Sequence, residues 1–220
     1  MLNPVEKLAT AISRRSRARK WTQFLALMTP GPTDRIIDVG VNTTEYSEAD
    51  NYLERQYAYP ENITAVGVET NFAEFKERYP AVTTVTSDGT RLPFADDAFE
   101  IGYSNAVIEH VGGRDKQLAF LSELYRVSQR GYLTTPNRLF PIEVHTRIPL
   151  LHLLLPKTLF DRVATALGKG WATGDYMHLL SRAELIALAS KAGIRHSEIL
   201  SNRFLGFTMT FTLIWNKSTP

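Results

Sequence analysis

The chain has 220 residues, a formal net charge of +2 and 44% hydrophobic residues, which suits one globular domain with a sizeable core. It contains no cysteine, so disulfides, thiolate zinc sites and thiol nucleophiles are excluded. The amino terminus lacks the apolar core of a signal peptide, and no apolar run approaches the roughly 20 residues that cross a bilayer. We therefore expect a soluble, cytoplasmic protein.

Residues 1–33 are predicted to form a helical cover in one or two pieces, ended by the prolines and glycine at 30–32. Apolar residues recur at helical spacing on both sides of a basic cluster. The cluster consists of Arg14, Arg15, Arg17, Arg19 and Lys20. We interpret it as a solvated helix surface, although such a cluster could also contact nucleic acid or anionic lipid.

The rest of the chain is organised around the stretch RIIDVGVN at residues 35–42. Its β-branched apolar run is typical of a strand covered on both faces of a parallel sheet, and it ends on Asp38 and Gly40. In an open α/β sheet, ligands bind at the carboxyl ends of the strands. We therefore expect the functional residues to follow this strand and its neighbours.

Further strands and helices alternate along the chain. The predicted strands cover residues 36–39, 63–68, 82–86, 99–103, 132–135, 195–200 and 208–215. The predicted helices cover residues 46–57, 72–78, 118–127, 159–167 and 181–192. Gly131 is expected to cap the helix over 118–127, and Ser181 with Glu184 forms a capping box for the last helix. Residues 34–220 are read as one domain with an insertion at about 136–178 on the substrate side.

The order of four motifs resembles the class I S-adenosylmethionine-dependent methyltransferases, in the branch called methyltransferase type 11. The motifs are RIIDVGVN, ITAVGVE, SDGTRLPF followed by DDAFE, and EHV, within residues 34–137. The resemblance implies a Rossmann-like, doubly wound α/β fold. Its seven-stranded sheet would be mostly parallel with an antiparallel last strand, and helices would cover both faces. It also implies S-adenosylmethionine as the cofactor.

The resemblance assigns roles to residues at the strand ends. Asp38 and Gly40 would line the methionine end of the cofactor, with Asn42 supplying hydrogen bonds. Glu69 would accept hydrogen bonds from both ribose hydroxyls, the strong kind made to an ionised carboxylate. The backbone carbonyl near Ser104 would accept from the methionine amino group.

The third strand leads to the residues expected around the adenine. Asp88 would accept a hydrogen bond from the adenine amino group, and the Gly89 N–H would face a ring nitrogen. For Glu69 and Asp88, a purely structural surface role is the alternative. The first loop has one glycine where most relatives have D-x-G-x-G-x-G, and it departs from that pattern at Asn42 and Thr44. An inactive, methyltransferase-like binding or scaffold domain is therefore a second hypothesis.

Methyl transfer to a hydroxyl needs a base, and His145 is the first candidate, followed by His110. Each could instead be a structural histidine. No metal site is expected, because the spacing of Glu143, His145 and His178 fixes no coordination geometry.

We expect a small-molecule or lipid-like methyl acceptor. The leucine-rich stretch at 150–155 suits an apolar acceptor or a peripheral membrane contact, but also packing onto the core or onto a second copy in a homodimer. Nucleic acid is not expected as a partner. An RNA methyltransferase is the third alternative, prompted by the basic cluster.

Overall fold

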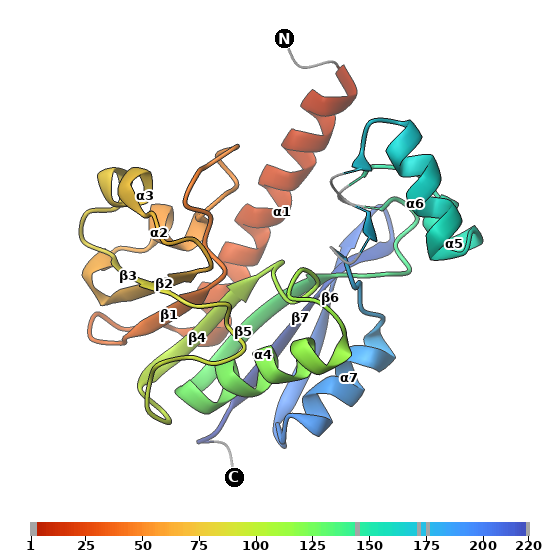
Figure 1. Ribbon diagram of the computed structural model, residues 1–220. Helices are drawn as coiled ribbons and strands as arrows, with labels where there is room; N and C mark the ends of the chain where they lie inside the picture. Colours follow the sequence, from red (N-terminus) through yellow and green to blue (C-terminus); the bar gives the residue numbers. More distant parts are fainter. Residues whose placement is uncertain (1–3, 144–145, 171–172, 175–176, 219–220) are drawn as a thin grey trace.

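Figure 1 shows the computed structural model of the chain, which describes residues 4–143, 146–170, 173–174 and 177–218. Its centre is a seven-stranded sheet in the order β3-β2-β1-β4-β5-β7-β6. The strands are β1 (Ile36–Val39), β2 (Ile63–Gly67), β3 (Thr83–Thr86), β4 (Phe99–Asn105), β5 (Ser128–Pro136), β6 (Ser197–Phe204) and β7 (Phe207–Asn216). The first five pair in parallel, and β7 runs antiparallel to both of its neighbours. The predicted fold class is confirmed.

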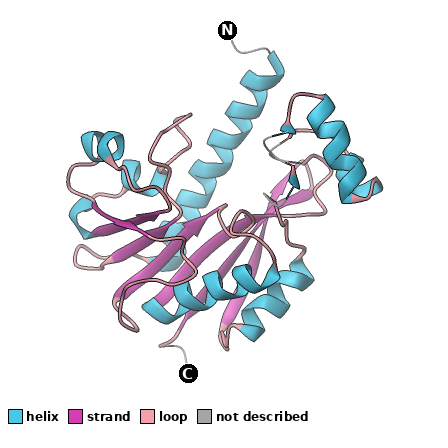
Figure 2. Ribbon diagram, in the orientation of Figure 1, coloured by secondary structure: helices cyan, strands magenta, loops and turns pink. Residues whose placement is uncertain are grey.

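Helices cover both faces of the sheet (Figure 2). On one face, α4 (Arg114–Val127) and α7 (Arg182–Lys191) bury their apolar sides against the strands. The other face carries α1 (Pro4–Met28), α2 (Tyr52–Gln56) and α3 (Ala73–Arg78). A 3-10 turn, η1 (Pro60–Asn62), precedes β2. Burying both faces explains why β1 is buried along its whole length and has an apolar run in its sequence.

Two segments extend beyond the carboxyl ends of the parallel strands (Figure 1). One is the amino-terminal part of α1, which is a single helix that ends at Met28, just before Pro30. The other contains α5 (Leu151–Leu154) and α6 (Lys157–Ala166), within the predicted insertion. The carboxyl-terminal edge of the sheet is therefore flanked by α1 and by the segment that contains α5 and α6.

The helix predicted over residues 46–57 is wrong in length, because only Tyr52–Gln56 is helical. Asp50 Oδ2 accepts hydrogen bonds from the backbone N–H groups of Tyr46 and Ser47, which closes a turn instead of a helix. Asn51 then adopts a left-handed conformation with φ 45°, directly before α2. Local side-chain to backbone hydrogen bonds thus compete successfully with the helix here.

Gly131 was expected to cap a helix, and this prediction is also wrong. Helix α4 ends at Val127 and passes directly into β5, with Gly131 inside the strand. A Cβ atom at Gly131 would lie 1.9 Å from Cζ2 of Trp215. The glycine is required because the indole ring of the neighbouring strand β7 occupies that space.

The end of the chain agrees with its sequence signals. Ser181 and Glu184 form the predicted capping box at the start of α7, and Gly193 follows the helix with φ +78°.

The leucine-rich stretch at 150–155 is partly packed and partly exposed. Leu151 and Leu155 pack against a small core that includes Phe160, whereas Leu154 is 73% exposed. Among the described helices, none combines the length and apolar character that a membrane crossing requires.

Candidate functional site

The carboxyl ends of the neighbouring strands β1, β2, β3 and β4 form one edge of the sheet. Val39 pairs with Val66, and Gly67 pairs with Thr86, so the residues that follow these strands emerge side by side. This edge carries the predicted cofactor-binding residues Asp38, Gly40, Asn42, Glu69, Asp88, Gly89 and Ser104. Parallel pairing thus brings together residues that are far apart in the sequence.

A cavity of about 80 Å³, the β1 cavity, opens beside the end of the first strand. Its lining includes Arg17, Asp38, Gly40, Asn42 and Asn105. Gly40 has φ +107°, and a Cβ atom there would lie 2.3 Å from the side chain of Val107. Both the backbone conformation and this close approach require glycine at the position.

The loop after Gly40 is closed by a side-chain amide instead of by further glycines. Asn51 Oδ1 accepts a hydrogen bond from the Asn42 N–H at 2.9 Å, and Asn51 Nδ2 donates to the Asn42 carbonyl at 2.8 Å. Asn51 Nδ2 also donates to Glu45 at 3.1 Å. The Asn42 backbone N–H is therefore already used within the loop. Any bond from Asn42 to a ligand must come from its exposed side chain.

Two buried carboxyl groups lie next to the β1 cavity. Asp38 is 6% exposed and Glu54, on α2, is 4% exposed, and neither carboxylate oxygen of Glu54 has a hydrogen-bond partner among the described residues. Burial raises the pKa of both, that of Glu54 to about 7, and the neighbouring Glu54 charge further raises the pKa of Asp38. The pair therefore holds a proton near neutral pH, which a bound cation would displace.

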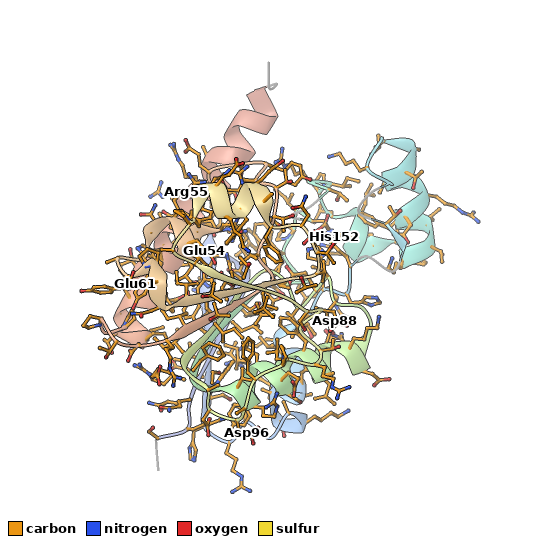
Figure 3. All side chains as sticks on the ribbon, turned by 60° about the vertical axis from the view of Figure 1, so that its left-hand side comes forward. Glu54, Arg55, Glu61, Asp88, Asp96 and His152 are labelled. Atoms are coloured by element: carbon orange, nitrogen blue, oxygen red, sulfur yellow. The ribbon has the colours of Figure 1, made fainter. Side chains whose placement is uncertain are left out.

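Glu69 and Asp88 are exposed at the ends of β2 and β3. The Glu69 carbonyl accepts a hydrogen bond from Thr86 Oγ1 at 3.0 Å. Asp88 Oδ1 accepts from the backbone N–H and the hydroxyl of Thr90, and this lowers the pKa of Asp88. Asp88 is therefore an ionised acceptor held in place by a local turn. Figure 3 shows Asp88 well apart from Glu54, so the two acids serve separate parts of the edge.

Gly89 and Ser104 are buried residues at the same edge of the sheet, and each is fixed by its neighbours. A Cβ atom at Gly89, which has φ +75°, would lie 2.6 Å from the ring of Phe120. The Gly89 N–H donates to Ser87 Oγ at a long 3.3 Å. Ser104 is fully buried, and its hydroxyl donates to the Val39 carbonyl at 2.8 Å, which ties β4 to β1. The Ser104 side chain is thus structural.

Residues 37–134 match the model of the methyltransferase domain family. Over this segment the chain is similar to the methyltransferase domains, and it shares the fold of S-adenosylmethionine-dependent methyltransferases. Strands β1 to β5 and the acidic strand ends lie within the matched residues or close to them, whereas β6 and β7 lie outside. A search of curated proteins finds no match to the chain.

Solved structures share this fold at low sequence identity. A methyltransferase from Methanosarcina mazei is 16% identical with a TM-score of 0.57, over 84% of this chain and 92% of that chain. Magnesium protoporphyrin IX methyltransferase from Synechocystis PCC 6803, solved with S-adenosylhomocysteine, is 16% identical with a TM-score of 0.58, over 97% and 87%. The CurJ carbon methyltransferase is 12% identical with a TM-score of 0.60, over 93% and 54%. Because these proteins differ in what they methylate, the fold leaves the acceptor open.

The basic cluster on α1 contributes a residue that the sequence interpretation missed. Lys20 is only 6% exposed, and its Nζ donates to Asn105 Oδ1 at 2.8 Å and to Thr134 Oγ1 at 3.4 Å. Burial, and after it the Arg17 charge, lowers the pKa of Lys20 to about 7, against the opposing effect of the Glu109 charge. The reading as a solvated surface is therefore wrong for Lys20. It holds for Arg14, Arg15 and Arg19, which are exposed.

A periodic signal for the burial of Lys20 is present in the sequence. Lys20, Phe24 and Met28 are spaced four residues apart on α1, and all of them are buried. The buried face of α1 thus extends one turn from Phe24 toward the amino terminus, and Lys20 occupies that position. The charge of Lys20, taken alone, predicts a side chain that faces solvent.

Of the two predicted catalytic histidines, the structure describes only His110. His145 lies outside the described residues, so its role stays a prediction. His110 is exposed, and its backbone N–H donates to the Val107 carbonyl at 2.7 Å. The neighbouring Glu109 is fully buried, and its Oε2 accepts from Thr135 Oγ1 at 3.1 Å. Within the described ranges, no group of three or more His, Asp or Glu side chains is arranged to hold a metal ion.

Proposed function

We propose that this protein transfers the methyl group of S-adenosylmethionine to an oxygen, nitrogen or carbon atom of a small-molecule or lipid-like acceptor. One observation carries the proposal. Neighbouring parallel strands each end on or next to an acid, namely Asp38, Glu69 and Asp88, and a polar cavity opens beside the first of them. Ligands of doubly wound sheets bind at this edge.

The chemistry of these residues fits the cofactor. The β1 cavity is lined by Arg17 and Asp38, and the buried carboxyl group of Glu54 interacts electrostatically with Asp38. Arg17 suits an amino acid carboxylate, and the carboxyl pair suits the amino group and the sulfonium. Glu69 and the ionised Asp88 are exposed acceptors for the ribose hydroxyls and the adenine amino group.

When bound, the cofactor supplies an activated methyl group on a positively charged sulfur. The leaving group needs no proton, so the residues of the protein have to align the acceptor and remove its proton where it has one. His145 and His110 are proposed for the second task. Lys20 is a further candidate, because its amine lies at the end of β4, beside Asn105 of the β1 cavity.

A specific observation favours the alternative of an inactive scaffold. The loop after β1 is closed by Asn51, and Val107 packs directly over Gly40, so the β1 cavity measures only about 80 Å³. Binding the cofactor would require this loop or Val107 to shift. In a scaffold domain that closed arrangement would be permanent.

Transfer of a labelled methyl group tests the proposal. The purified protein is incubated with methyl-tritiated S-adenosylmethionine and a small-molecule extract, and label is measured in the extracted products. We expect incorporation with the wild type and a strong loss with Asp38→Asn. Glu77→Gln, an exposed carboxylate on α3, is the control that keeps the activity. A folded wild type that transfers no label from any extract would favour the scaffold.

A further inference from the structure

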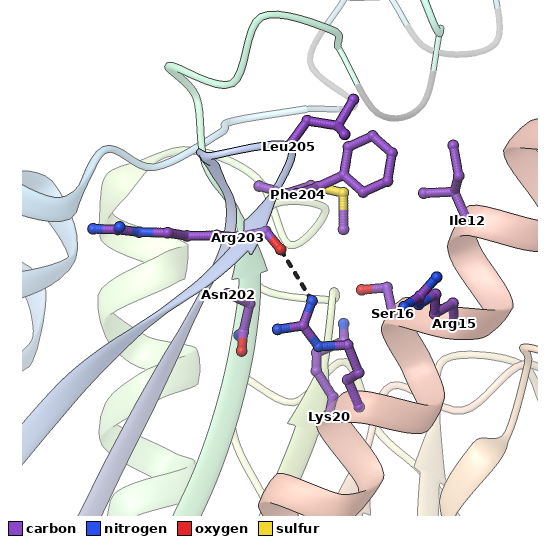
Figure 4. A pocket seen from close by; sticks show the side chains of 10 residues that line it. Ile12, Arg15, Ser16, Lys20, Asn202, Arg203, Phe204 and Leu205 are labelled. Atoms are coloured by element: carbon purple, nitrogen blue, oxygen red, sulfur yellow. Dashed lines mark hydrogen bonds between the residues drawn. The ribbon is translucent and has the colours of Figure 1, made fainter.

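A second cavity of about 240 Å³ lies between α1 and the tip of the β6–β7 hairpin (Figure 4). We call it the α1–hairpin cavity. It shares no lining residue with the β1 cavity. The two are joined by one hydrogen bond, in which Lys20 of the α1–hairpin cavity donates to Asn105 of the β1 cavity at 2.8 Å. The second cavity thus meets the β1 cavity at Asn105.

The charge of this cavity is one-sided. Its described lining contains the basic side chains of Arg15, Arg19 and Lys20 and no acidic residue. Arg19 Nη1 donates to the Arg203 carbonyl at 3.1 Å, which holds the guanidinium at the cavity while its other N–H groups stay available. The Arg203 side chain itself points away from the cavity (Figure 4).

Arg14, which directly precedes Arg15 on α1, differs from the arginines of the cavity. It lies outside the lining of the cavity, and it approaches Glu48 at 4.0 Å. Neither Arg15 nor Arg19 has a carboxylate within ion-pair distance among the described residues. Cations that converge on a cavity without an acidic partner favour binding of an anion.

The remaining wall is apolar. It is formed by Ile12, Phe204, Leu205 and Met209. Leu205 is 82% exposed, and Phe207 beside it on the hairpin is 58% exposed. Large apolar side chains at a cavity mouth favour a ligand with an apolar body.

We infer that the α1–hairpin cavity is the acceptor site of this methyltransferase domain, and that its acceptor is an amphiphilic anion, an acidic group on an apolar body. The inference rests on the proposed function and specifies its substrate class. Arg15 and Arg19 would pair with the acidic group, and the apolar wall would cover the body. Lys20 stands at the inner end, where the nucleophilic atom has to lie.

The inner end is suited to a hydroxyl nucleophile. The pKa of Lys20 is about 7, so near neutral pH a large share of its side chains carries a neutral amine. The acceptor O–H would lose its proton to this amine as the O–CH₃ bond forms. The C–S bond breaks, its electron pair stays on sulfur, and the proton passes from Lys20 to solvent.

Calorimetric titration with octanoate tests the site without knowledge of the natural acceptor. Octylammonium and octanol have the same apolar body with a positive or no charge. We expect octanoate to bind at least about tenfold more tightly than either, the scale of one charge-assisted hydrogen bond. Arg19→Gln should weaken octanoate binding by about tenfold, and Arg14→Gln should leave it unchanged. Equal binding of octylammonium, or an unaltered affinity in Arg19→Gln, would overturn the inference.

The same titration on protein saturated with S-adenosylhomocysteine separates the two proposals. Octanoate binding that persists in the saturated protein supports an acceptor site distinct from the cofactor site. If S-adenosylhomocysteine binds but octanoate does not, only the acceptor inference is overturned. If S-adenosylhomocysteine itself fails to bind the folded protein, the methyl-transfer proposal is overturned, and the acceptor assignment falls with it.

Discussion

Lys20→Met removes a buried amine and keeps an unbranched side chain of similar length. In the wild type, Lys20 Nζ donates to Asn105 Oδ1, which also accepts from the hydroxyl of Thr134. Asn105 Oδ1 therefore keeps a donor after the substitution, and no buried acceptor is left unpaired. The variant isolates the effect of the charge.

The sign of the effect follows from the lowered pKa of Lys20, which falls from 10.5 to about 7 on folding. Between these values the unfolded chain binds the proton and the folded chain releases it. The free energy of unfolding therefore rises with pH across this window, and it falls as the pH drops toward 7. From pH 7 to 9, a shift of this size contributes about 2 kcal/mol, at about 1.4 kcal/mol per pH unit once the folded form is neutral.

Urea denaturation at pH 7, 8 and 9 measures this contribution as the difference between the wild type and Lys20→Met. We expect the wild type to gain about 2 kcal/mol on the variant between pH 7 and 9. Lys191→Met is the matched control, because Lys191 lies exposed on α7, and its difference from the wild type should stay constant. A constant difference for Lys20→Met as well would refute the burial of the Lys20 amine and its role at the inner end of the acceptor site.

Three further outcomes are expected. Binding of S-adenosylmethionine near pH 7 should release protons, because the positive charge of the ligand lowers the raised pKa of the buried carboxyl groups of Asp38 and Glu54. Calorimetry in buffers of different ionisation enthalpy should show this release. The variant Asp38→Asn should release fewer protons. Gly40→Ala should lower the melting temperature more than Gly206→Ala, since both glycines have positive φ but only Gly40 lacks room for a Cβ atom; equal losses would contradict the steric argument. Asp88→Ala should weaken cofactor binding by about 1–3 kcal/mol and Asp96→Ala should not, so equal affinities would remove Asp88 from the site.

The sheet was predictable because its strands carry their own signal. Strands β1 and β2 are short runs rich in β-branched and apolar residues, and they are followed by or end on the acids Asp38 and Glu69. The capping box of α7 was equally local, since Ser181 and Glu184 bond within one turn. Features fixed by neighbours in sequence could therefore be read from the sequence alone.

Features fixed by distant partners could not. The role of Gly131 depends on Trp215, which is 84 positions away in the numbering of the chain and adjacent only in the sheet. The inward position of Lys20 depends on Asn105 at the end of β4. Helix α2 was overestimated because the bonds of Asp50 and Asn51 to the preceding loop outweigh helical periodicity. The α1–hairpin cavity likewise forms from the two ends of the chain.

Titration of S-adenosylhomocysteine into the wild type, Glu69→Gln and Glu77→Gln tests most directly whether carboxylates at the strand ends hold the nucleoside. Glu69 follows β2, and Glu77 is another exposed acid, on α3. We expect single-site binding to the wild type and to Glu77→Gln, with affinity about tenfold lower in Glu69→Gln as charge-assisted bonds to the ribose are lost. Absence of binding at millimolar ligand, or the same affinity in all three proteins, would contradict the assignment.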